Sequence, residues 1–65
     1  MLTVYLKGGY YMLKRLKENL YESGCHFEFL NDELDVLTID SDEERVLRQF
    51  CEDIGISIMN EEVTE

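Results

Sequence analysis

Apolar and polar side chains alternate over the first seven residues. The apolar positions are Leu2, Val4 and Leu6. A period of two is typical of a strand that buries one face. Gly8 and Gly9 interrupt the pattern, so we predict a strand that ends just before them.

From residue 10 to about residue 22 the period becomes helical. At about 100° per residue, four apolar side chains fall on one stripe and charged side chains fall opposite. The stripe consists of Met12, Leu13, Leu16 and Leu20. Gly24 follows, and glycine is the usual residue just beyond the C-terminus of a helix. We predict a helix over residues 10–22.

A tight turn at residues 31–32 joins two apolar segments, residues 25–30 and 33–39, and predicts a β-hairpin. In the register that a two-residue turn imposes, four apolar side chains share the inner face of the sheet. These side chains are Phe27, Phe29, Leu34 and Val36. The same register places Leu37 and Ile39 on the outer face.

Ser41 and Glu44 form a capping-box pattern at the start of a second helix, since each side chain can satisfy a free backbone N–H of the first turn. The apolar face of this helix consists of Val46, Leu47, Phe50, Cys51 and Ile54. Gly55 ends it. We predict a short last strand over residues 56–59 and a flexible acidic tail over residues 60–65.

The predicted order of elements is β-α-β-β-α-β, within one α+β domain over residues 1–59. This order is that of the ferredoxin-like fold, in which two helices cover one face of a four-stranded antiparallel sheet. The outer sheet face would carry Tyr5, Leu37 and Ile39 among its residues. That is more apolar surface than a solvated face needs, so we expect this face to contact a partner.

The chain is strongly acidic, with a formal net charge of −9 over 65 residues. Residues 1–17 hold four basic groups and no acid, whereas residues 18–65 hold fifteen acids and two arginines, which gives +4 and −13. Binding nucleic acid through its phosphates requires clustered Lys and Arg. We therefore expect a basic protein as the partner, and no direct contact with nucleic acid or membrane.

Candidate catalytic and metal-binding groups are few. Cys25 and Cys51 fit neither a CxxC pair nor a zinc-ligand spacing, and we expect reduced cytosolic thiols. His26 falls near Glu28 and Asp35 in the predicted register, and a lone histidine is usually neither a ligand nor a switch. With no nucleophile paired to a base and no phosphate-binding loop, we expect a cytoplasmic, non-enzymatic protein without cofactor or metal.

One stretch of the chain carries a family resemblance. Its residues are Thr3-Val4-Tyr5-Leu6-Lys7-Gly8-Gly9, then Lys14, Lys17, Leu20, Gly24 and Phe27-Glu28. Residues 3–28 thereby resemble the opening βαβ of glutaredoxins and their NrdH-like relatives. In that family a Cys-x-x-Cys pair begins the helix and supplies the nucleophile, and here Tyr10 and Leu13 stand at those positions. The resemblance implies a redox-inactive relative with a truncated thioredoxin-like βαβ fold, as an alternative to the ferredoxin-like one.

The glycines between the first strand and helix, with a leucine-rich helix that ends before Gly24, are also similar in layout to ACT-type ligand-sensing modules. Such modules bind amino acids at a dimer interface near that loop. This likeness implies a homodimer, formed through the outer sheet face or an edge strand, that binds a small ligand near Gly8 and Gly9.

Our leading hypothesis is a small acidic binding protein that modulates or inhibits a larger basic protein, nucleic-acid-binding proteins included. By analogy, small phage or mobile-element proteins that block host machinery, some of them nucleic-acid mimics, share this acidity and lack of a catalytic site. The residues expected to bind the partner are Asp32, Glu33, Asp35, Asp40, Asp42, Glu43, Glu44, Tyr5, Tyr11, Leu37 and Ile39.

Overall fold

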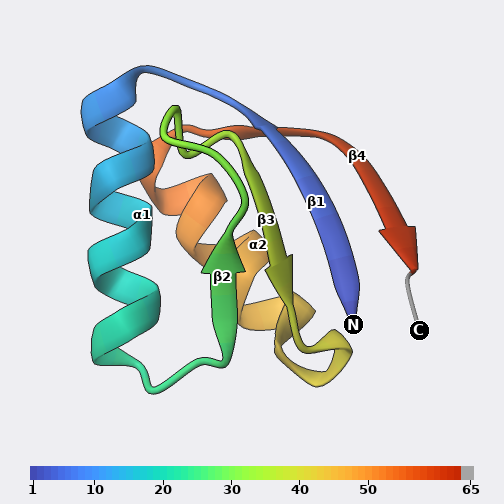
Figure 1. The fold of residues 1–65 in the computed structure, drawn as a ribbon. Helices are drawn as coiled ribbons and strands as arrows, with labels where there is room; N and C mark the ends of the chain where they lie inside the picture. The colour runs from blue at the N-terminus through green and yellow to red at the C-terminus, as the bar shows by residue number, and fades with distance from the viewer. Residues whose placement is uncertain (64–65) are drawn as a thin grey trace.

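The computed structural model describes residues 1–63 and has the predicted α+β architecture (Figure 1). Its elements are β1 (Leu2–Lys7), α1 (Tyr10–Glu22), β2 (Phe27–Phe29), β3 (Val36–Ile39), the 3-10 turn η1 (Ser41–Glu43), α2 (Glu44–Ile54) and β4 (Ser57–Val63). The strands form one sheet in the order β2-β3-β1-β4, and all neighbouring pairs are antiparallel. This is the ferredoxin-like topology. No helix within residues 1–63 has the length and apolar character needed to cross a bilayer.

The thioredoxin-like alternative is wrong. Strand β1 lies between β3 and β4 and is antiparallel to both. A simple βαβ unit would instead place its two strands parallel and side by side. The resemblance to the opening of glutaredoxins therefore does not extend to the fold.

One core lies between the helices and the inner face of the sheet. The predicted stripe of α1 contributes Leu13, Leu16 and Leu20, and α2 contributes Leu47 and Cys51, all of them buried. Fully burying a leucine contributes about 1.5–3 kcal/mol. The two amphipathic stripes thus hold both helices on the same side, and Figure 1 shows α2 behind the strands while the other face of the sheet stays uncovered.

The register between β2 and β3 differs from the predicted one by three residues. Phe27 lies opposite Ile39, and Phe29 lies opposite Leu37. The connection therefore covers residues 30–35 instead of a two-residue turn. Because a shift by an odd number of residues exchanges the two faces of a strand, the expected faces of β3 are also exchanged.

Leu37 and Ile39 are both 0% exposed, so their expected place on the outer face is wrong. They lie opposite Val4 and Leu2 of the central strand β1. Burying these two large apolar side chains favours this register over the tight turn, which would have left both in water. Val36 takes the outer position instead, opposite Tyr5.

Leu34 shows how the longer loop is held. Its φ of 61° lies in the left-handed region, which costs a residue with a side chain about 1–2 kcal/mol. Its N–H donates to the carbonyl oxygen of Asn31 at 3.3 Å, and its side chain is buried against the core. The burial offsets the backbone strain.

The start of α2 also differs from the prediction. Ser41 begins η1, so Glu44 is the first residue of α2, and neither helical segment has a side-chain capping hydrogen bond. The extra 3-10 turn separates Ser41 from the first turn of α2. The Glu44 carboxylate instead lies 3.7 Å from the guanidinium of Arg48. The predicted capping box is therefore wrong.

The last strand is longer than predicted. Residues 60–63, expected to be a flexible tail, continue β4 and pair with β1 as far as Leu2 opposite Val63. A bulge falls at Tyr5 and Leu6, where the register with β4 shifts. Beyond it Glu61 lies opposite the buried Val4. The rest of the expected tail, residues 64–65, lies outside the described residues.

Candidate functional site: an edge-strand groove and two acidic clusters

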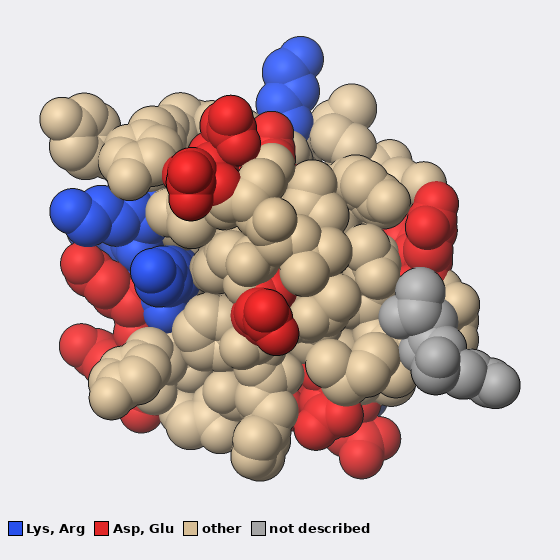
Figure 2. Space-filling model, in the orientation of Figure 1, with Lys and Arg blue, Asp and Glu red and all other residues tan. Residues whose placement is uncertain are grey.

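The predicted acidic residues form two clusters at opposite ends of β3. Asp32, Glu33 and Asp35 lie in the loop before the strand, and the others lie after it, from Asp40 to Glu44. Asp40 lies five positions after Asp35 along an extended segment, which corresponds to about 16 Å. Figure 2 accordingly shows the acidic side chains in several separate groups on this side of the molecule.

Most carboxylates of the second cluster have partners within the fold. Glu43 Oε1 accepts the backbone N–H of His26 at 2.9 Å, and this hydrogen bond lowers the pKa of the Glu43 carboxyl. Glu44 lies beside Arg48, which also pairs with Glu61. Asp42 is exposed. Reversing the charge of Glu43 or Glu44 would therefore disturb the fold as well as a surface.

The loop cluster is more accessible. Asp32 and Glu33 are exposed. Asp35 is half-buried, and its Oδ1 accepts a hydrogen bond from the side-chain amide of Asn31. Asp32 and Glu33 are consequently the carboxylates of the predicted set best placed to meet a partner without loss of an internal contact.

The apolar and aromatic residues predicted to bind the partner differ in how exposed they are. Leu37 and Ile39 belong to the core and are removed from the candidate surface. Tyr5 is half-buried on the outer sheet face. Tyr11 is 84% exposed on α1 and packs edge-on against Tyr10, with 6.0 Å between the ring centroids.

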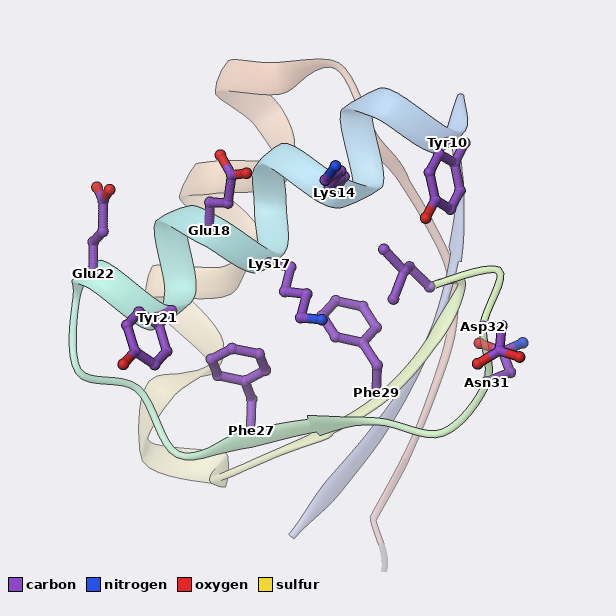
Figure 3. Close-up of a pocket in the computed structure, with 11 residues that line it drawn as sticks. Tyr10, Lys14, Lys17, Glu18, Tyr21, Glu22, Phe27, Phe29, Asn31 and Asp32 are labelled. Carbon is purple, nitrogen blue, oxygen red and sulfur yellow. The ribbon is translucent and has the colours of Figure 1, made fainter.

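A groove of about 690 Å³ lies between α1, β2 and the loop that follows β2. Phe27 and Phe29 form its floor, with ring centroids 5.8 Å apart in a T-shaped arrangement. Lys17 and Tyr21 of α1 point across the groove toward β2, and Tyr10 lies at the end near the loop that follows β2 (Figure 3). Glu18 and Glu22 border it too, but their carboxylates point away from β2 in Figure 3. The interior of the groove is therefore largely aromatic.

Strand β2 is an edge strand, and its unpaired edge, on the side away from β3, borders this groove. Asp40 N–H donates to the His26 carbonyl at 3.2 Å, and Leu30 N–H donates to the Val36 carbonyl at 2.8 Å. In an antiparallel pair, residues alternate between hydrogen-bonded and non-hydrogen-bonded positions. Residues 26, 28 and 30 therefore bond to β3, and the backbone groups of Phe27 and Phe29 point away from it.

The two thiols are poor nucleophiles. Burial, reinforced by the neighbouring Glu43, raises the pKa of Cys25 to about 11. Burial also raises the pKa of Cys51 to about 11, although Arg48 lowers it in part. Since the thiolate is the reactive form, both side chains stay protonated at neutral pH. Cys51 packs in the core as a small apolar group, whereas the Cys25 thiol donates a hydrogen bond to the Glu43 carboxylate.

Side chains with metal-ligand spacing occur once in residues 1–63, at His26, Asp40 and Glu43. His26 Nδ1 lies 3.7 Å from Asp40 Oδ2 and 3.6 Å from Glu43 Oε1. The expected cross-strand neighbour of His26, Asp35, depended on the wrong register; Glu28 lies two residues along the same strand in either register. The actual neighbours follow from the shift by three residues.

Sequence reasoning missed the groove. Its floor comes from β2 and its wall from α1, and only the packing of α1 beside the edge strand brings them together. One signal was present: Tyr21 lies on the polar face of α1 and is 80% exposed, in line with a helix face that borders a groove.

Comparison of the chain with family models, curated proteins and solved structures finds no match. The groove and the charges described above are therefore the features that bear on function.

Proposed function

We propose that the protein is a small non-enzymatic binding protein that captures an extended segment of a larger, basic protein and so modulates or inhibits it. The observation that supports this most directly is the free edge of β2. The backbone N–H and C=O groups of Phe27 and Phe29 point out of the sheet beside an aromatic groove. An extended segment can pair with such an edge as an additional strand.

Side-chain contacts would supply the specificity. Alternate residues of an added strand point to the same face as Phe27 and Phe29, and there they meet the groove between β2 and α1. Apolar side chains at those positions would pack against the two phenylalanines and Tyr21. Lys17, which points toward Phe29 in Figure 3, would cover them with its aliphatic stem while its ammonium group stays in water.

Charge favours a basic partner. The net charge of −9 attracts a cationic protein at long range and speeds the encounter. Asp32 lines one end of the groove and Glu33 follows it, both exposed. Basic residues that flank the captured segment would meet these two carboxylates. The separation of the acidic clusters favours this mode over nucleic-acid mimicry, which calls for a continuous row of carboxylates.

A second candidate function is a small-ligand module of the ACT type. The groove volume lies within the range of about 300–1,000 Å³ that is usual for small-molecule sites. Tyr10, directly after Gly8 and Gly9, lines one end of it. Such a module would bind an amino acid at that end and would form a dimer.

A peptide display library tests the strand-capture proposal. We expect the immobilised protein to select peptides with apolar residues at alternate positions and basic residues toward one end. Tyr21→Ala should weaken binding of a selected peptide several-fold, because Tyr21 lines the groove. Tyr11→Ala is the matched control, since Tyr11 is equally exposed on the same helix but lies outside this groove.

The same peptide provides two further readouts. Amide exchange at Phe27 and Phe29 should slow on binding, and Asp32→Lys with Glu33→Lys should reduce affinity most at low salt. Selection of no peptide, or selection of peptides that leave these two amides unprotected, would contradict strand capture. Dimerisation together with a higher melting temperature in the presence of amino acids would favour the small-ligand module instead.

A further inference from the structure

Three side chains converge where β2 begins and β3 ends. His26 precedes β2, Asp40 follows β3 and Glu43 ends η1. One possible ligand atom from each of the three side chains lies within 4.8 Å of the other two. The three residues are separated by up to seventeen positions in sequence, so the fold and not local sequence brings them together.

The spacing of these atoms suits a shared cation better than direct contact. The imidazole nitrogen lies 3.7 and 3.6 Å from the two carboxylate oxygens, beyond the usual range for a hydrogen bond. In a tetrahedral zinc site with bonds of about 2.0–2.1 Å, neighbouring ligand atoms are about 3.3–3.4 Å apart. Small rotamer adjustments would bring the three atoms to that separation.

Backbone hydrogen bonds hold the three residues in place. His26 N–H donates to Glu43 Oε1 at 2.9 Å. Asp40 N–H donates to the His26 carbonyl at 3.2 Å, and Glu43 N–H donates to the Asp40 carbonyl at 2.9 Å. The cluster is therefore linked in a closed ring of contacts, which reduces the ordering that a bound ion would require.

The donor set selects among cations. One imidazole nitrogen with two carboxylate oxygens suits borderline transition metals such as Zn²⁺, whereas Mg²⁺ and Ca²⁺ prefer oxygen ligands alone. The two carboxylates and the net charge of −9 add electrostatic attraction for a divalent ion. His26 is largely exposed, with 83% of its side chain accessible, so solvent water can complete the coordination shell.

We propose that His26, Asp40 and Glu43 form a binding site for one divalent transition-metal ion, with Zn²⁺ as the representative. The ion links the start of β2 to the end of β3 and to η1. It would strengthen the short edge strand at the end distant from the loop. This proposal is independent of strand capture, because none of the three residues lines the groove.

The single histidine makes the test direct. Protein stripped with EDTA is titrated with ZnCl₂ while the two ring-proton signals of His26 are followed by NMR, with calorimetry for stoichiometry. We expect one ion per chain, an affinity in the micromolar range, a raised melting temperature and weaker binding at pH 5 than at pH 7.5, since protons compete for the ligands. Mg²⁺ at the same concentration should not shift the signals.

Matched variants locate the site. His26→Ala and Asp40→Asn should each weaken Zn²⁺ binding about tenfold or more, as even the outer-shell partners of metal ligands contribute that much. Asp42→Asn should not, because Asp42 is an exposed carboxylate of the same segment outside the cluster. Both ligand variants replace partly or largely exposed side chains, and circular dichroism confirms their folding.

The thiols of Cys25 and Cys51 are the other side chains that could bind Zn²⁺. Cys25→Ser and Cys51→Ser should retain Zn²⁺ binding. Loss of binding in either serine variant, equal loss in Asp42→Asn, or no response of the His26 ring signals to Zn²⁺ would overturn the proposal.

Discussion

The two edges of the sheet differ in how they end. Strand β4 has seven residues and pairs with β1 from Ser57 to Val63. It carries a bulge in its register and an inward-pointing carboxylate, Glu61, which pairs with Arg48 of α2. Strand β2 has three residues and borders a groove. Bulges and inward charges are devices by which proteins prevent an edge from pairing with another chain.

The two edges therefore differ in whether another chain can pair with them. Both devices are present at β4, whereas β2 is protected only by its short length. The molecule therefore blocks one edge and leaves the other accessible beside apolar side chains. This asymmetry is what makes β2 the candidate for strand capture.

The largest expected effect concerns β3, the strand with which the accessible edge strand β2 pairs. Leu37→Ala should lower the free energy of unfolding by about 2–5 kcal/mol, as removal of a fully buried leucine leaves a cavity. Val36→Ala, on the outer face of the same strand, should lower it by about 1 kcal/mol or less. Urea denaturation measures both. A larger loss in Val36→Ala than in Leu37→Ala would instead favour the tight-turn register, in which the pairing of β2 with β3 is shifted by three residues.

The closed edge can be weakened at Arg48. Arg48→Ala leaves the mostly buried Glu61 carboxylate without its cationic partner, and one of the Glu61 oxygens already lacks a hydrogen bond among the described residues. Arg48 itself is half-exposed, which reduces the effect. We expect a loss of about 1 kcal/mol in the free energy of unfolding. Arg45→Ala is the exposed control. An equal loss in Arg45→Ala would mean that the pair of Arg48 with Glu61 does not stabilise β4.

The pH dependence of stability probes the same carboxylate. Burial and the neighbouring Glu44 raise the pKa of Glu61 above its ordinary value of 4.5, although Arg48 lowers it in part. The folded state then binds a proton more tightly than the unfolded state. Stability from this group therefore rises as the pH falls from neutral through the raised pKa, and it levels off below the ordinary one.

Glu43 acts in the opposite sense and in a more acidic range. Its lowered pKa gives stability that is present above the ordinary value and lost as the pH falls through the lowered pKa.

Melting temperatures between pH 7 and pH 5 should therefore rise more in the parent protein than in Glu61→Gln. Parallel curves for the two proteins would show that Glu61 has an ordinary pKa.

The smallest expected effect is confined to the hydrogen exchange of backbone amides. In the free protein, the backbone amides of Phe27 and Phe29 should exchange rapidly, while those of Glu28 and Leu30 are protected by β3. Hydrogen exchange followed by NMR resolves the four amides. Equal protection of all four would mean that the edge of β2 is already covered.

The order of elements was predictable because each amphipathic period has a clear start and stop. Leu13, Leu16 and Leu20 repeat at helical spacing, and Gly24 ends α1 with a φ of 72°. The β2–β3 register was not predictable in this way. A two-residue turn also aligned apolar residues, and only the competition for the core between Leu37 and Val36 decides between the two registers.

That register also decides the candidate sites. The predicted pairing placed Asp35 near His26, whereas the observed pairing brings Asp40 to it. Glu61 was assigned to a tail because its charge suggested solvent. Its inward position follows from a long-range pairing with Val4 that no local pattern indicates.

The pairing of Leu2 with Val63 brings the first and last described strands together at the same end of the sheet. Neighbouring strands are about 4.8 Å apart, so the path of the backbone is almost a closed ring. A short linker between the two ends, with new termini opened in the loop over residues 30–35, gives a circular permutant that keeps every strand neighbour. In such a permutant β2 would end the chain, and the accessible edge would be its last strand.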